Sequence, residues 1–99
     1  MISDLEENKW VNNLFIEIVK FVDVDNVMTR RGQRVIYIFR VRDSSGECFL
    51  KLWNIECSSF IEEYIKPGKK AYVVAGYVSI YNSAFFINVN KIQDIKIVV

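Results

Sequence analysis

The segment SFIEEYIKPG, residues 59–68, is the internal stretch of this sequence whose pattern favours a helix. Ser59 and Glu62 have the spacing of a capping box, in which each side chain satisfies a backbone N–H group at the start of a helix. The larger apolar side chains share one side of the expected helix: Phe60, Ile61, Tyr64 and Ile65. Pro67 and Gly68 follow and favour its end. The segment therefore predicts one short helix over residues 59–66.

On both sides of this helix the sequence favours β-strands. The expected strands are rich in Val, Ile, Phe and Tyr, and they cover residues 13–28, 33–42, 47–53, 70–81 and 84–90. Asp43 and Gly46 bound a four-residue segment typical of a tight antiparallel turn, and the pair Asn82-Ser83 favours a two-residue hairpin turn. We expect residues 92–99 to extend the last strand, and residues 3–6 to form a capped turn before the first.

Alternation along the expected strands separates an inner face from an outer face. In residues 47–53, Cys48, Leu50 and Leu52 form one set, which we expect to be buried. The other set is not simply polar, because it holds two aromatic residues and a cation: Phe49, Lys51 and Trp53. By the same period, the sequence places further outward residues on the neighbouring strands: Ile38, Arg40, Arg42, Tyr77, Ser79 and Tyr81.

Three strands, one short helix and two further strands are the element order of the OB-fold, a small, partly open Greek-key barrel. SH3-like and ferredoxin-like folds place their helices differently. The sequence therefore predicts an all-β protein with a five-stranded OB-fold barrel and a helix between strands three and four. We expect residues 1–12 to be a lead-in segment and residues 13–99 to form the domain.

Composition excludes several functional classes. The chain has 99 residues, no histidine and two cysteines, so a histidine general base, a disulfide framework and a zinc site are all disfavoured. No apolar run approaches the roughly 18 residues that span a membrane, and the first ten residues are acidic, unlike a signal peptide. We expect a reduced intracellular protein without catalysis, cofactor, metal or membrane contact.

Charge is distributed unevenly along the chain. The formal net charge of +1 divides into −4 over residues 1–27, +4 over residues 28–54 and +1 over residues 55–99. The basic block holds all five arginines, which is typical of a local anion-binding surface, although a solvated charged face explains charge alone equally well.

Several short motifs resemble a known family when taken in order. They are FRVRDSSG at 39–46, LKLWN at 50–54, KPG at 66–68 and AGYVSIY at 75–81. Over residues 13–97 they resemble the OB-fold single-stranded DNA-binding proteins: the simple one-domain type of archaea and of the eukaryotic sensor-of-single-stranded-DNA complex, and the DNA-binding domains of replication protein A. The resemblance implies base stacking by Trp53, Tyr77 and Tyr81. The aromatic position on the family's fifth strand falls near Asn88, with Phe86 two residues before it.

The residues themselves favour the same site, because single strands are bound by aromatic platforms beside cationic groups. To the three aromatics above we add Phe49, Phe86, Arg40, Arg42 and Lys51, and, in the turn between the first two strands, Arg30 and Arg31. Phe39 and Tyr72 are assigned to packing, Asp43 to the turn's hydrogen bonds and Cys48 to the core. Ordinary solvated charges would also explain the arginines.

The sequence thus predicts binding of single-stranded nucleic acid, with DNA favoured over RNA, for genome maintenance. The compartment would be nuclear in a eukaryote and cytoplasmic in an archaeon. The alternative is an OB-fold protein-interaction subunit of a larger single-strand-binding or telomere-capping complex, because exposed aromatics rimmed by arginine suit protein partners as well.

Overall fold

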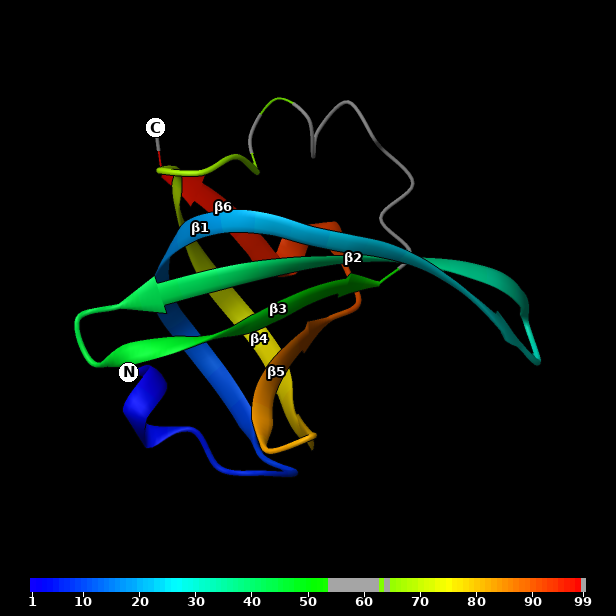
Figure 1. The fold of residues 1–99 in the computed structure, drawn as a ribbon, viewed down its shortest axis with the longest axis horizontal. Coiled ribbons are helices and arrows are strands. Elements are labelled where there is room, and N and C mark those ends of the chain that lie inside the picture. The colour runs from blue at the N-terminus through cyan, green and yellow to red at the C-terminus, as the bar shows by residue number, and fades with distance from the viewer. Residues whose placement is uncertain (54–62, 64, 99) are drawn as a thin grey trace.

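The computed structural model describes residues 1–53, 63 and 65–98 (Figure 1). In chain order, its elements are the 3-10 helix η1 (Ile2–Asp4), the strands β1 (Trp10–Thr29), β2 (Gly32–Asp43), β3 (Gly46–Trp53), β4 (Lys70–Tyr81) and β5 (Ala84–Val89), the 3-10 helix η2 (Ile92–Asp94) and the strand β6 (Ile95–Val98). Among these described residues, no helix is long and apolar enough to cross a membrane.

Five of the strands close into a ring. The order β1-β2-β3-β5-β4 is completed by pairing of β4 back onto β1. Every pairing in the ring is antiparallel except that of β3 with β5, which is parallel. Such a closed five-stranded ring is the barrel of the OB-fold. The predicted all-β architecture and its five-stranded barrel are therefore confirmed.

Strand β1 closes the barrel because it serves two neighbours. Its residues 10–17 pair with β4, and its residues 17–29 pair with β2. Two irregularities in the register with β2, between Ile18 and Lys20 and between Phe21 and Asp23, bend the strand. Beyond them, β1 and β2 continue as a long hairpin that extends away from the barrel (Figure 1).

The predicted boundaries hold best in the middle of the chain. Strands β2, β3 and β5 lie within one residue of prediction at each end, and β4 has the predicted bounds. Strand β1 begins at Trp10, three residues earlier than expected. Most of the predicted helix at 59–66 falls on residues outside the described part of the chain, so it stays a prediction. A capped turn was expected over residues 3–6, but the structure has η1 over Ile2–Asp4 with no side-chain cap.

One strand prediction is wrong. Residues 92–98 do not extend the last strand, because the chain turns through η2 and then forms the separate strand β6. β6 pairs antiparallel with the first four residues of β4. This turn lets Ile95 become buried and Ile97 pack against the core, which a straight continuation of β5 would not achieve.

The core is formed by the inward residues of the barrel strands, as alternation predicts. Phe39, Val41, Cys48, Leu50 and Leu52 are all buried. Burial and the nearby charge of Asp43 raise the pKa of the Cys48 thiol to about 12, which keeps it protonated and unreactive.

Ile36 and Tyr72 show how burial and strand face are related in this barrel. Ile36 is buried although it lies on the outward side of β2, directly opposite Trp53 of β3. Tyr72 was assigned to packing, and it does pack across two strands: its ring lies 5.0 Å from that of its β1 partner Phe15, on the outside of the barrel with 44% of its surface exposed. Tyr72 is therefore a surface residue, because it alternates with the buried Ala71 and Val73.

Candidate nucleic-acid interface

The outward residues of β3, β5 and β4 bring several predicted site residues together. In the register of the barrel, Phe49 lies beside Phe86, and Lys51 lies beside Asn88. On the other side of β5, Tyr77 lies beside Asn88 and Ser79 beside Phe86. Directly opposite residues in a sheet point to the same face, so these side chains form one surface, which we call the aromatic face. It consists of Phe49, Lys51, Trp53, Tyr77, Ser79, Phe86 and Asn88, together with Arg40 and Trp10 as described below.

One end of the aromatic face is a stack with a cation above it. The rings of Phe49 and Phe86 lie 5.0 Å apart at an interplanar angle of 19°. The Nζ atom of Lys51 lies 4.6 Å from the centre of the Phe86 ring, a cation–π geometry. Within the described residues Lys51 makes no ion pair, so its charge remains available to an anion.

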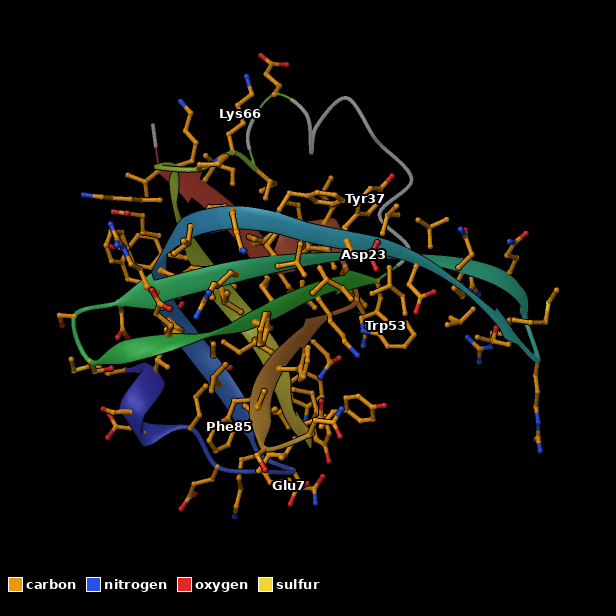
Figure 2. The ribbon with its side chains drawn as sticks, in the orientation of Figure 1. Glu7, Asp23, Tyr37, Trp53, Lys66 and Phe85 are labelled. Atoms are coloured by element: carbon orange, nitrogen blue, oxygen red, sulfur yellow. The ribbon has the colours of Figure 1, made fainter. Side chains whose placement is uncertain are left out.

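At the other end, Asn88 fixes the position of Trp53. The Trp53 side chain projects from the end of β3 (Figure 2). The indole Nε1–H of Trp53 donates to Oδ1 of Asn88 at 3.0 Å. The Asn88 amide in turn donates to the backbone carbonyl of Tyr77 and to the hydroxyl of Ser79, both at 2.9 Å. Asn88 stands near the position where the family resemblance implies an aromatic residue. In the structure it orients the aromatic side chain of Trp53 instead.

Trp10 joins this face, although sequence reasoning missed it. Its ring meets that of Tyr77 edge to face, with centroids 5.5 Å apart and an angle of 67°. Trp10, Trp53, Tyr77, Asn88 and Asn90 line a shallow hollow of about 390 Å³. Sequence reasoning left Trp10 in the lead-in segment, and alternation counted back from the buried Leu14 would have placed it on the inner side. Asn13 has a φ angle of 54°, an irregularity that simple alternation does not anticipate.

The predicted basic residues divide among three places. Arg40 lies beside Phe49 on the aromatic face, but its Nε atom pairs with Glu47 at 3.0 Å. Arg42 binds Glu17 through two nitrogens, at 2.7 and 3.1 Å. Arg30 and Arg31 form the turn at the tip of the long hairpin, where the Thr29 hydroxyl closes the turn by donating to the Gly32 carbonyl at 2.8 Å.

Tyr81, the third predicted stacking residue, lies at the end of β4 and is 67% exposed. It adjoins the predicted two-residue turn, which is confirmed: Asn82 and Ser83 have φ angles of 50° and 65°, as a type I′ hairpin turn requires.

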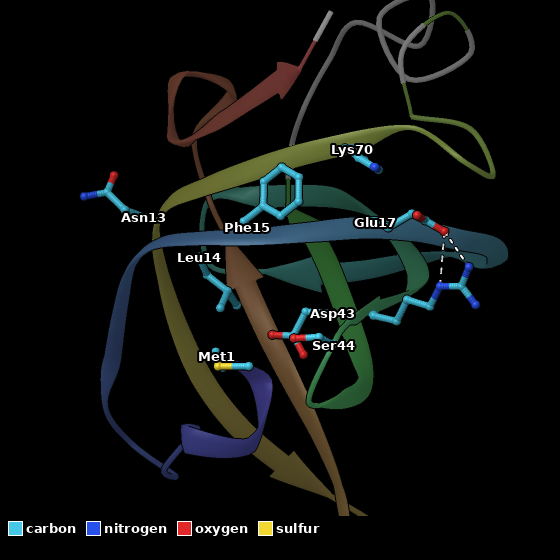
Figure 3. A pocket seen from close by; sticks show the side chains of 9 residues that line it. Met1, Asn13, Leu14, Phe15, Glu17, Asp43, Ser44 and Lys70 are labelled. Carbon is cyan, nitrogen blue, oxygen red and sulfur yellow. Dashed lines mark hydrogen bonds and ion pairs between the residues drawn. The ribbon is translucent and has the colours of Figure 1, made fainter.

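Arg42 belongs to a second hollow of about 690 Å³ (Figure 3). Its lining includes Phe15, Glu17, Lys70 and Asp43. The charges at this hollow are mixed, because Glu17 and Asp43 line it together with Arg42 and Lys70, and Arg42 already pairs with Glu17.

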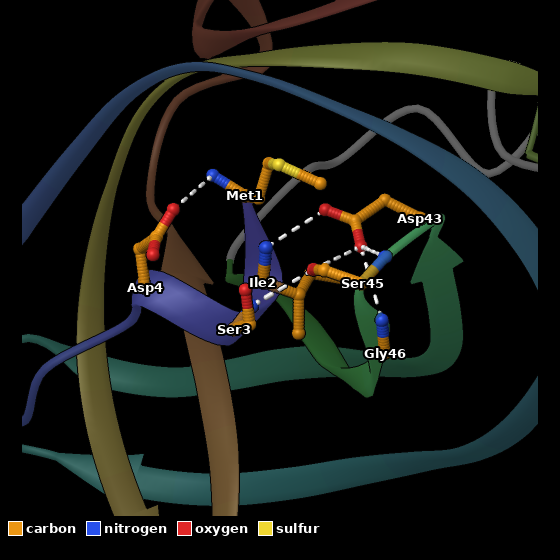
Figure 4. Close-up of polar contacts among 7 residues, drawn as sticks. All are labelled: Met1, Ile2, Ser3, Asp4, Asp43, Ser45 and Gly46. Atoms are coloured by element: carbon orange, nitrogen blue, oxygen red, sulfur yellow. Dashed lines mark hydrogen bonds and ion pairs between the residues drawn. The ribbon is translucent and has the colours of Figure 1, made fainter.

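Asp43 has the structural role that the sequence predicts (Figure 4). Its Oδ1 accepts from the backbone N–H groups of Ser45 and Gly46, at 2.7 and 3.2 Å, and Oδ2 accepts from the N–H of Ile2 at 2.7 Å. Burial alone would raise the pKa of Asp43, but these hydrogen bonds and that of the Ser45 hydroxyl together lower it below its ordinary value. Asp43 thereby ties the first residues of the chain to the β2–β3 turn.

In the described part of the chain, no cluster of three or more His, Cys, Asp or Glu side chains could hold a metal ion.

A closed ring of five strands, with a parallel β3–β5 pair and an aromatic outer face on β3, β4 and β5, defines an OB-fold domain. Its fold is similar to a solution NMR structure of the second OB-fold domain of replication protein A from Methanococcus maripaludis. The similarity has a TM-score of 0.75 and covers 99% of this chain and 92% of that one, at 24% sequence identity. The predicted resemblance to replication protein A is thus confirmed for the fold. No family model and no curated protein sequence matches the chain.

Proposed function

We propose that this domain binds single-stranded nucleic acid, with DNA favoured over RNA, and performs no catalysis. The observation behind the proposal is the aromatic face, where Trp53 is held by Asn88 and Lys51 stands over an aromatic stack without an ion pair in the described residues. Bases would stack on the rings, and a phosphate would meet Lys51. The fold's similarity to a domain of replication protein A supports a role in genome maintenance.

The test is titration of a labelled thymidine oligonucleotide, followed by fluorescence anisotropy. Trp53→Ala should weaken binding by about 5- to 150-fold, because stacking contributes roughly 1–3 kcal/mol per base. Tyr72→Ala is the matched control, since it removes an exposed ring from the same barrel outside the aromatic face. Equal affinities of the two variants, with both folded by circular dichroism, would remove Trp53 from the site.

Salt dependence tests the phosphate contact separately. Each phosphate contact to a single strand contributes about −0.7 to the log–log salt slope. Lys51→Gln should therefore make the slope shallower by about 0.7. Arg42→Gln should leave it unchanged, because Glu17 already holds Arg42 at the second hollow. The opposite result would place the phosphate path along Arg42 and away from the aromatic face.

The long hairpin supports the alternative of a protein-interaction subunit. Val24 and, at the base of the hairpin, Phe21 and Val22 are each more than 40% exposed, and Met28 is 80% exposed. Clustered exposed apolar residues are typical of protein contacts. If the parent protein does not bind oligonucleotides at low salt, the aromatic face and this hairpin together favour protein docking.

A further inference from the structure

We propose that Trp10 and Trp53 form opposite walls of a pocket that takes a single unstacked base of the bound strand. This inference rests on the proposed function and adds a ligand position that involves β1. Trp10 stands on β1, Tyr77 on β4, Asn88 on β5 and Trp53 on β3, which is their order around the barrel. The hollow of about 390 Å³ thus has an indole at each side and Asn88 between them.

The Trp10 wall is fixed before any ligand arrives. The Tyr77 hydroxyl, whose ring meets Trp10, donates to Oδ1 of Asn8 at 3.1 Å. The backbone before Trp10 is anchored to Val78 by two hydrogen bonds of 2.9 Å, one to Lys9 and one from Asn8. Trp10 nevertheless remains 60% exposed, so the ring is positioned but not covered. A preorganised, exposed ring binds a flat partner at low entropic cost.

Asn88, between the two indoles, has no free amide hydrogen for a base edge, which leaves the exposed Asn90 as the other amide of the lining. Both hydrogens of the Asn88 amide are used, by the Tyr77 carbonyl and the Ser79 hydroxyl, and its oxygen accepts from Trp53. A base in the pocket would therefore be held by its faces, which every base offers. We expect little preference among thymine, cytosine and adenine at this position.

Charge favours a base over a phosphate as the occupant, and the hollow is large enough to take one. Its volume of about 390 Å³ lies within the roughly 300–1,000 Å³ typical of small-ligand pockets. The lining consists of aromatic rings and amides without a charged side chain, so it favours a neutral flat group over a phosphate. The phosphates of the same strand would lie toward Lys51.

The two tryptophans make the test direct, because each single replacement leaves the other as the sole indole reporter. In Trp53→Phe, we expect a saturating twelve-residue thymidine oligonucleotide to quench the emission of Trp10. Trp10→Ala should lose about 5- to 150-fold in affinity, whereas Trp10→Phe, which keeps a ring, should stay within about threefold of the parent. Tyr72→Ala serves again as the control.

The outcomes separate the two proposals. If the parent binds but Trp10 emission does not change and Trp10→Ala keeps parental affinity, the pocket is refuted and the proposed function stands. If the parent does not bind the oligonucleotide, both are refuted. Loss of fold in Trp10→Ala is detected by circular dichroism, and the emission of Trp10 in Trp53→Phe then decides the question without that variant.

Discussion

Asn88 is the residue whose removal tests the proposed geometry of the aromatic face most sharply. Asn88→Ala removes three hydrogen bonds of 2.9–3.0 Å, to Trp53, Tyr77 and Ser79. A hydrogen bond contributes a net 0.5–1.5 kcal/mol to stability, and these groups are only partly buried, so water replaces some of the loss. We expect the free energy of unfolding to fall by about 1–3 kcal/mol.

Urea denaturation followed by circular dichroism measures this loss, and thermal melting gives a second estimate, since each kcal/mol lowers the Tm by about 4–8 °C in a domain of this size. The matched control is Asn90→Ala, which removes an exposed asparagine just beyond the same strand. That control should change stability by no more than about 0.5 kcal/mol.

Oligonucleotide affinity should fall together with stability in Asn88→Ala, because an unrestrained indole must be ordered again on binding. Asn88→Asp keeps an acceptor for the Trp53 N–H but loses the donor to the Tyr77 carbonyl. Its carboxylate also lies directly beside Lys51 and repels phosphate, so Asn88→Asp should bind more weakly than the parent, with the largest loss at low salt. The reasoning is refuted if Asn88→Ala and Asn90→Ala unfold at the same urea concentration, or if Asn88→Ala binds as the parent does.

Two further predictions concern the barrel. Gly76→Ala should lower the free energy of unfolding by about 1–3 kcal/mol, because its Cβ would lie 2.6 Å from Cγ2 of Ile87 and force the core to shift; parental stability in urea would contradict this. Asp43 has a lowered pKa in the folded state, so the stability it contributes is present above its ordinary value of 3.8 and is lost as the pH falls through the folded value. The stability difference between parent and Asp43→Asn should accordingly shrink as the pH is lowered from 5 toward 2, and a constant difference would show that ionisation of Asp43 is irrelevant.

The barrel was predictable where local signals determine pairing. The turn from Asp43 to Gly46 sets the register of β2 against β3, and alternation then assigns Phe39 and Leu50 to the core. Pairing between distant segments leaves no such local signal. β6 is placed by its contacts with the start of β4, and β1 is bent by irregularities that follow from serving two neighbours. Those are the elements whose bounds the sequence misplaced.

The candidate site was likewise predictable where it depends on alternation within one strand. Alternation identified the outward side of β3 correctly, and with it Phe49, Lys51 and Trp53. It could not identify the acceptor of the Trp53 N–H, because Asn88 lies 35 residues further along the chain. Nor could it identify Trp10, which reaches the face only because β1 pairs with β4.

Charge shows most clearly why a count along the sequence misleads. The block from 28 to 54 has a net charge of +4, yet Arg40 pairs with Glu47 and Arg42 with Glu17 in the folded chain. Glu17 comes from the acidic first segment, so folding places a carboxylate of that segment beside an arginine of the basic one. Lys51 is the cation of the aromatic face that has no ion pair within the described residues. Exposed ion pairs contribute only about 0–1 kcal/mol, so the paired arginines still carry positive charge that can attract an anion from a distance. Under the proposed function, close contact on this face would depend chiefly on its aromatic rings.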